Sequence, residues 1–179
     1  MIKIHMGCGW RNFGPGWIHI DGGDYKHLDS NSITCLPYEN NSVSLIYASH
    51  VLAYFDREEV VALLEEWKRV LKTGAILRLA VPNFQAYVKL YQSKQITLDQ
   101  CLGPFYGKMA MGESSIYHKT VYDFNSLKSL LEKLGFNNII KYKWQETEHC
   151  ARDDHSQAYI PHMDKNHGTL MSLNVECFK

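Results

Sequence analysis

The middle of the chain alternates two apolar runs with one amphipathic stretch, and this order limits the fold more than any other feature. Val43 to Ser49 (VSLIYAS) and Ala75 to Val81 (AILRLAV) are near-continuous apolar segments of the kind that form buried strands. Between them, Asp56 matches a helix N-cap, and apolar residues then recur at helical spacing up to Gly74, where we expect the helix to end. Buried strands that alternate with helices predict a largely parallel sheet covered on both faces.

The other expected elements share short apolar patterns bounded by Gly, Pro, Asp or Asn. We expect strands at Ile2–Met6, Trp17–Ile20, Ser32–Cys35, Asn138–Trp144 and Leu170–Phe178, and helices at Phe84–Tyr91 and from Asp123 to Gly135. No repeat or linker divides these elements, so we expect residues 1–179 to form a single domain.

Residues 93–122 are less regular and mix glycines with large apolar side chains. This composition predicts a lid or pocket wall with little core of its own. Its apolar residues form either an acceptor pocket or the core of the lid itself: Phe105, Tyr106, Met109, Met111 and Tyr117.

Charge and cysteine content exclude several classes of protein. Nineteen Lys plus Arg balance nineteen Asp plus Glu, so no net charge attracts nucleic acid or anionic lipid. The five cysteines are odd in number and include no C-x-x-C pair, which indicates reduced thiols. No apolar run reaches membrane-spanning length, and the N-terminus enters a strand pattern without a signal peptide. We therefore expect a cytoplasmic protein with no nucleic-acid or membrane partner.

The first strand pattern runs directly into Gly7-Cys8-Gly9, and the second ends at Asp21. Ligands of open α/β sheets lie beyond the carboxyl ends of the strands, where glycine lets the backbone approach a ligand closely. Asp21 is placed to accept hydrogen bonds from the two hydroxyls of a ribose; the alternative is a tight turn that Asp21 caps. The spacing departs from the dinucleotide fingerprint, because Asn12 stands where the third glycine belongs and Gly14 follows, which argues against NAD or FAD.

Five segments then carry a resemblance that is more specific than any one of them. In chain order they are KIHMGCG, GWIHID, LPYENNSVSLIYASHVLAYF, EEWKRVLKTGAILRLAVPN and HKTVYDFNSLKSLLEKLGF. Together, over about Lys3 to Phe136, they resemble the type-11-like S-adenosylmethionine-dependent methyltransferases, most closely a short branch of this class I superfamily. The resemblance implies methyl transfer from S-adenosyl-L-methionine to an unidentified small-molecule acceptor.

The resemblance also implies a fold. It predicts a Rossmann-like class I methyltransferase sheet that is mostly parallel, with seven strands, the first strand central and the last one antiparallel. In this sequence, the first crossover helix is short or missing, because Pro15 and Gly16 fall in the gap where it would form.

The same resemblance implies roles for particular residues. Gly7, Cys8 and Gly9 would form the turn against the methionine portion of the cofactor, Asp21 would bind the ribose, Leu36 would lie near the adenine, and Ser49 and His50 would line the floor at the methyl group. His50 and His118 are the candidate catalytic bases, because imidazole titrates near neutral pH. The alternative is that His50 packs against the cofactor and that His118 hydrogen-bonds the lid. Cys8 is expected to be a small buried residue rather than a nucleophile.

Several departures from the family pattern favour a second hypothesis, a noncatalytic protein that binds the cofactor or a partner. His5 stands where many members of the superfamily carry an acid, and Thr34 and Cys35 occupy a stretch that often holds another. Tyr54 replaces the second His of the family's HVLEH motif. Intact Gly7, Gly9 and Asp21 favour the enzyme.

Residues 148–167 hold many potential metal ligands, including His149, Cys150 and His155. Their spacings match no zinc motif that we can name, so we expect no metal. The segment is expected to be a solvated loop before the last strand, or else to reach the acceptor site.

Overall fold

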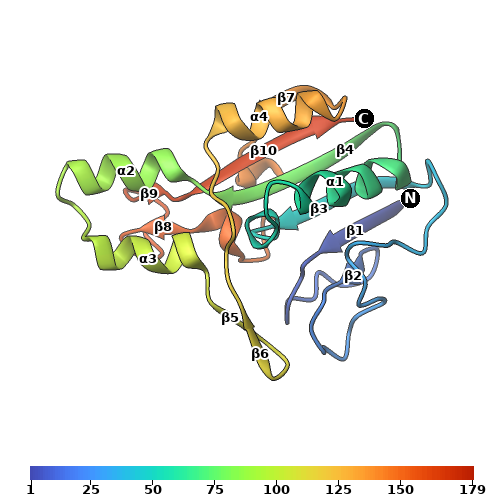
Figure 1. The fold of residues 1–179 in the computed structure, drawn as a ribbon, viewed down its shortest axis with the longest axis horizontal. Coiled ribbons are helices and arrows are strands. Elements are labelled where there is room, and N and C mark those ends of the chain that lie inside the picture. Colours follow the sequence, from blue (N-terminus) through green and yellow to red (C-terminus); the bar gives the residue numbers. More distant parts are fainter.

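A six-stranded sheet runs through the molecule in the computed structural model, which describes residues 1–179 (Figure 1). The strand order is β2-β1-β3-β4-β10-β7. β10 is antiparallel to both its neighbours, and the other neighbouring pairs are parallel, which confirms the mostly parallel sheet with an antiparallel last strand. The strands are β1 (Ile2–Met6), β2 (Ile18–Ile20), β3 (Val43–Ser49), β4 (Leu71–Pro82), β7 (Asn137–Lys141) and β10 (Ser172–Phe178).

Two expectations about the sheet are wrong. It has six strands rather than seven, and β1 lies next to the edge rather than at the centre. The expected strand at Ser32–Cys35 is absent, and only Ser30 forms an isolated parallel bridge to β2. The backbone there bonds to helix side chains instead of a strand: the Ile33 carbonyl accepts from the indole N–H of Trp67 at 2.9 Å.

Four helices accompany the sheet: α1 (Glu59–Val70), α2 (Phe84–Gln92), α3 (Leu98–Tyr106) and α4 (Phe124–Lys133). The acid at Asp56 caps α1 as expected, because its Oδ1 accepts from the N–H groups of Glu58 and Glu59 at 2.9 and 2.8 Å. The expected helix end at Gly74 is wrong. α1 ends at Val70, and β4 begins at the next residue, so Gly74 lies within the first part of β4 at φ +76°. No helix is both long and apolar enough to cross a bilayer.

The shorter elements lie in the second half of the chain. α2 and α3 pack beyond the carboxyl ends of β3 and β4, and the β5–β6 hairpin projects from this lobe (Figure 1). The lobe has a small apolar cluster of its own: Ala86, Tyr87, Leu90, Ile96, Cys101 and Met171. The remaining elements are β5 (Met109–Met111), β6 (Ser114–Ile116), β8 (Tyr159–Ile160), β9 (Thr169–Leu170), η1 (Leu52–Tyr54), η2 (Trp144–Glu146) and η3 (His155–Gln157).

One face of the sheet, here called the helix face, packs against α1 and α4 (Figure 1). Successive side chains of a strand point to opposite faces, so every second residue of each strand contributes to this core. Those residues are almost all aliphatic: Ile4, Met6, Ile20, Ile46, Ala48, Leu77, Leu79, Val81, Leu173, Val175 and Cys177. This pattern explains why the apolar runs of the sequence predicted the strands well.

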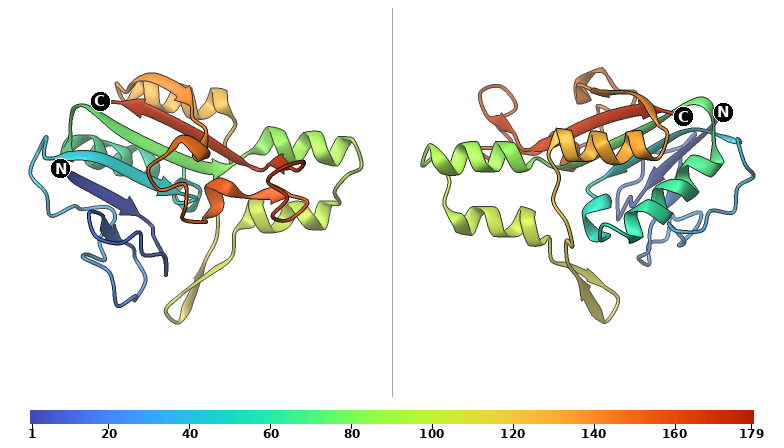
Figure 2. Two further views of the ribbon diagram at one scale, coloured as in Figure 1. Left: turned by 180° about the vertical axis from the view of Figure 1, so that it is seen from behind. Right: turned by 45° about the horizontal axis from the view of Figure 1, so that its top comes forward.

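The opposite face, here called the polar face, is equally buried but chemically different. It carries His5, His19, Tyr47, Arg78, Ser172, Asn174 and Glu176, and all but Glu176 are buried. No α-helix covers it; largely irregular chain does, from the segment after β1 and from residues 144–158, which include η3 (Figure 2). Phe13 stacks on His5 with ring centroids 3.8 Å apart, and His149 packs on Tyr47 at 4.1 Å.

This cover corrects the expectation of a solvated loop before the last strand. Asp154 is buried and accepts a hydrogen bond from the Tyr47 hydroxyl at 2.5 Å. Arg78 donates to Glu148 at 2.7 Å and to Glu176 at 3.1 Å. Glu148 and Asp154 of this segment are therefore partners of the polar face, whereas Arg152, Asp153, His162 and His167 are exposed.

Candidate functional site

The turn after β1 contains two glycines with different roles. Gly7 and Gly9 have φ values of +64° and +58°, the left-handed region that disfavours other residues. A Cβ at Gly7 would overlap the side chain of Val51, so Gly7 serves close packing. A Cβ at Gly9 would meet no atom within 4 Å. Gly9 therefore borders open space, where a ligand can approach the backbone.

Asp21, at the end of β2, faces this turn. Its Oδ2 accepts from the Gly9 N–H, and its Oδ1 accepts from the Gly23 N–H, both at 2.7 Å. An ionised carboxylate has about four acceptor positions, so each oxygen keeps one for a ligand. The residues present therefore fit a ribose, with one hydroxyl donating to each carboxylate oxygen.

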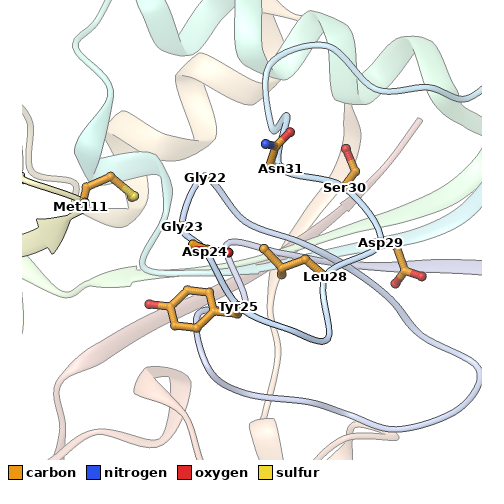
Figure 3. Close-up of a pocket in the computed structure, with 10 residues that line it drawn as sticks. Gly22, Gly23, Asp24, Tyr25, Leu28, Asp29, Ser30, Asn31 and Met111 are labelled. Carbon is orange, nitrogen blue, oxygen red and sulfur yellow. The ribbon is translucent and has the colours of Figure 1, made fainter.

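An open hollow of about 610 Å³ begins directly beyond Asp21 (Figure 3). The loop after β2 lines it, including Gly22, Gly23 and Tyr25, and Met111 of the β5–β6 hairpin lies at its rim. The Met111 thioether lies 3.8–3.9 Å from where a Gly22 Cβ would stand, so the hairpin reaches the loop after β2. The sequence analysis named Met111 as a pocket candidate but missed the lining residues after β2, which the Gly-Gly pair after Asp21 could have indicated.

The other predicted pocket residues in 93–122 do not gather around one space. Phe105 packs on Tyr87 with ring centroids 5.3 Å apart, inside the α2–α3 lobe. Tyr106, Met109 and Tyr117 are exposed. The segment therefore contributes to the lobe core and, through Met111, to the hollow.

Leu36 and Cys8 are both buried. Leu36 belongs to the core of the helix face, and its N–H donates to Glu66 of α1 at 2.7 Å. The Cys8 thiol lies 3.7 Å from Nε2 of His27. Burial, reinforced by the charge of Asp21, raises the pKa of Cys8 to about 12, so the thiol stays protonated and is no nucleophile.

Ser49 and His50 follow one another at the carboxyl end of β3. The Ser49 hydroxyl is buried and has no hydrogen-bond partner, which leaves a polar atom for a ligand to satisfy. His50 has a φ of +56°, held by a hydrogen bond of 2.7 Å from its N–H to the Ala80 carbonyl. Strained backbone of this kind is concentrated at functional sites.

Other positively charged or titratable groups surround His50. The ring of His155, from η3, lies 5.0 Å from the His50 ring. Burial, and then the charges of His155, His118 and Arg11, hold the pKa of His50 well below its usual range. The ring is therefore neutral at physiological pH. Sequence reasoning did not single out Arg11, and His155 appeared only among possible metal ligands.

His118 is near enough to His50 to influence its pKa, although its own contacts are with the lid segment. Its Nδ1 lies 2.8 Å from the Pro104 carbonyl, and its ring lies against Gly107 and, at 4.5 Å, the ring of Tyr54. The Tyr54 hydroxyl donates to the Gly107 carbonyl at 2.9 Å. Burial lowers the pKa of His118. These contacts match the alternative in which His118 stabilises the lid.

His5, which replaces an acid of the wider superfamily, lies on the polar face between aromatic rings. Burial, followed by the charges of His19 and His149, lowers its pKa to about 2. A neutral, enclosed imidazole offers no negative charge to a cofactor ammonium. Among the described residues, no group of three His, Cys, Asp or Glu side chains is arranged to hold a metal ion.

Comparison with known proteins agrees with this geometry. Residues 21–79 match the family described as "Methyltransferase domain". No curated protein matches the chain. Many solved structures do, with low sequence identity and a shared fold.

Three of these structures illustrate the likeness. An S-adenosylmethionine-dependent methyltransferase from Archaeoglobus fulgidus is 14% identical, with a TM-score of 0.59 over 99% of this chain and 86% of that one. Another, from Methanosarcina mazei, is 16% identical, with a TM-score of 0.54 over 99% and 90%. The 1,6-didemethyltoxoflavin-N1-methyltransferase of Burkholderia thailandensis, solved with 1,6-didemethyltoxoflavin and S-adenosylhomocysteine, is 10% identical, with a TM-score of 0.58 over 99% and 70%. Residues 21–79 therefore resemble a methyltransferase domain, and the whole chain shares the fold of solved S-adenosylmethionine-dependent methyltransferases.

Proposed function

We propose that this protein transfers a methyl group from S-adenosylmethionine to a small-molecule acceptor. The observation that carries the proposal is the Asp21 carboxylate, which holds the turn at Gly9 and keeps one acceptor position on each oxygen, while the loop that follows it lines an open hollow. The Burkholderia thailandensis protein, which was solved with a small aromatic ligand, supports the acceptor class by analogy.

The chain's own residues have defined tasks in this proposal. Bound S-adenosylmethionine supplies an electrophilic methyl group on a sulfonium, whose sulfur leaves as a neutral thioether. Asp21 and the backbone at Gly9 fix the ribose and the methionine portion, and the unpartnered Ser49 hydroxyl lies at the methyl end. Alignment of this kind can contribute about 7–11 kcal/mol to lowering a barrier.

Calorimetric titration with S-adenosylhomocysteine tests the cofactor site. Asp21→Ala removes a charged acceptor from two hydroxyls, so binding should weaken by about 1.5–3 kcal/mol, or roughly 10- to 150-fold. Asp99→Ala, on the exposed surface of α3, is the matched control and should bind as the wild type does. Equal affinity for wild type and Asp21→Ala, both folded by circular dichroism, would exclude the assigned role.

A second variant tests the open space at Gly9, with Gly16→Ala as its control, because alanine strains both left-handed glycines (φ +58° and +94°) and a Cβ at either would meet no atom within 4 Å. Gly9→Ala keeps the N–H that donates to Asp21 and puts a methyl group into the open space. Weaker binding by a folded Gly9→Ala protein would support the site, whereas unchanged binding would place the cofactor elsewhere.

Binding without turnover is the second candidate, and one observation favours it: His5 replaces an acid with a neutral, buried ring. Incubation with methyl-labelled S-adenosylmethionine and a panel of hydroxyl and amine metabolites distinguishes the two. Label transfer to any acceptor supports the enzyme. Tight binding with no transfer across the panel supports the noncatalytic alternative.

A further inference from the structure

A short chain of hydrogen bonds connects His50 to the polar face. The bond at the end farthest from His50 determines which group donates at each step. The side-chain N–H₂ of Asn174 donates to the Ser156 carbonyl at 2.9 Å. A carbonyl only accepts, so this bond orients the amide and turns its oxygen, Oδ1, toward Ser172. The Ser172 hydroxyl lies 2.9 Å from that oxygen and must donate to it, because Oδ1 has no proton to give.

The Ser172 hydroxyl donates its only proton to Asn174. Its oxygen can therefore only accept a hydrogen bond from His50. Nε2 of His50 lies 3.3 Å from it. Nε2 must therefore carry the ring proton, and a neutral ring then has its lone pair on Nδ1. Ser172 and Asn174 are 2% and 4% exposed, so bulk water has little access to compete for these bonds.

Nδ1, the basic nitrogen, has no protein partner. It makes no hydrogen bond within the chain, so its lone pair is left for the proton of an acceptor. The left-handed backbone at His50 and its bond to the Ala80 carbonyl hold the ring at the carboxyl end of β3. The unpartnered Ser49 hydroxyl is its chain neighbour.

We propose that Ser172 and Asn174 are positioning residues that hold His50 as the Nε2–H tautomer, so that Nδ1 takes the proton of the methyl acceptor. This role rests on the proposed function. The N–H or O–H bond of the acceptor breaks, its electron pair stays on the acceptor atom to bond the incoming methyl carbon, and the proton passes to Nδ1. The imidazolium that results still donates from Nε2 to Ser172.

The charges around His50 favour an unprotonated ring, which can accept a proton but is a weak base. His155 and His118 face it from η3 and the lid segment, Arg11 faces it from the glycine turn, and the Ser172–Asn174 chain is neutral. The ring is therefore unprotonated at physiological pH. A weak base suffices for an acceptor nitrogen or oxygen that becomes strongly acidic as it gains the methyl group.

Nitrogen-15 NMR of the histidine rings tests the tautomer without cofactor, acceptor or turnover, with His50→Gln identifying the His50 signals. In the wild type, Nε2 of His50 should give the protonated signal and Nδ1 the unprotonated one. Ser172→Ala removes the acceptor and should shift the ring to a mixture of tautomers or to the Nδ1–H form. Ser156→Ala, whose backbone carbonyl stays in place, is the matched control and should leave the signals unchanged.

Asn174→Asp supplies a second test, because a carboxylate still accepts from Ser172 and also adds a negative charge. The Nε2–H tautomer should persist, and the pKa of His50 should rise. A protonated Nδ1 in the wild type would overturn the proposal, and so would a wild-type tautomer in folded Ser172→Ala.

Activity adds a readout once an acceptor is known. Ser172→Ala should lower kcat and change its pH profile while S-adenosylhomocysteine binds with unchanged affinity. A kcat equal to that of the wild type would overturn the positioning role. A protein that shows the expected tautomer but fails to bind S-adenosylhomocysteine would instead refute the proposed function alone.

Discussion

The two faces of the sheet reach the same degree of burial by different chemistry. The helix face buries aliphatic side chains such as Ile4, Ile46 and Leu79 under two amphipathic helices. On the polar face, one residue along, His5, Tyr47 and other polar side chains are buried under irregular chain. Apolar burial needs no particular partner, whereas a buried polar group is costly unless it finds one, and a few on this face, such as the His149 ring, do not. The helix face therefore supplies stability, and the polar face supplies specific geometry next to the site.

Acidification should lower the free energy of unfolding more than any substitution below, and it should act through the polar face. The folded pKa values of His5 and His149 are about 2 and about 4, below the 6.5 of an exposed imidazole, because burial opposes their charging. Below pH 6.5 the unfolded chain takes up these two protons and the folded protein does not, so stability falls as pH falls. These two rings alone should lower the free energy of unfolding, measured by urea titration, by about 4 kcal/mol between pH 7.5 and 5, and the other histidines whose pKa values burial lowers should add to this loss.

A variant assigns this effect to the polar face. In His149→Phe, one of the two groups is gone, so the drop over the same pH range should be smaller by about 2 kcal/mol. A wild-type stability that is the same at pH 7.5 and pH 5 would contradict the neutral, buried state of both rings.

Truncation on the helix face should be costly but insensitive to pH. Leu64 of α1 is fully buried, and Leu64→Ala leaves a cavity, so the free energy of unfolding should fall by about 3 kcal/mol. The loss should be the same at pH 7.5 and pH 6, because no titratable group is involved. Exposed Glu65→Ala is the control and should change stability by less than about 0.5 kcal/mol. A loss for Leu64→Ala that grew on acidification would show that the two faces are coupled.

Removal of one hydroxyl tests whether the stability of the polar face depends on its hydrogen-bond partners. Tyr47→Phe takes the donor from Asp154 and leaves a buried carboxylate oxygen without that bond, at a cost of about 2 kcal/mol. Tyr91→Phe, at an exposed position of α2, makes the same chemical change and should be neutral. Equal stability of Tyr47→Phe and wild type in urea would mean that the bond is not important for folding.

The smallest expected effect concerns the strained backbone at His50. Alanine retains the Cβ that disfavours a left-handed conformation and glycine does not, so His50→Gly should be more stable than His50→Ala by about 1 kcal/mol. Thermal unfolding of the two variants measures this difference. The reverse order would indicate that the backbone relaxes once the ring is removed.

Much of the fold could be predicted from the sequence because the helix face follows simple periodicity. Strands such as Val43–Ser49 and the cap at Asp56 depend on local patterns, and both were found. The strand expected at Ser32–Cys35 does not form, because the backbone there bonds to α1. Local sequence does not encode this contact. The polar face was also missed, because its covering residues become buried only through distant partners: Thr147, His149, Asp154, Ser156 and Gln157.

The candidate site shows the same limit. Gly9 and Asp21 were predicted from their places after two strands, and a hydrogen bond joins them. Ser172 and Asn174 lie more than a hundred residues from His50 along the chain and approach it only because β10 pairs with β4. Neither residue is unusual in a strand, so no local sequence pattern indicated that they lie near His50.

The contact between Met111 and the Gly22 loop has a consequence for the order in which ligands bind. The β5–β6 hairpin leads within a few residues to His118, which lies against Gly107 and Tyr54. If an adenosine group enters the hollow, it must displace or clamp Met111, and the same stretch of chain would carry that change toward His118 and His50. We expect the cofactor to bind before the acceptor, and the amides of Ser114–Ile116 to exchange with solvent more slowly when S-adenosylhomocysteine is present. Exchange at an unchanged rate would mean that the two halves of the site fill independently.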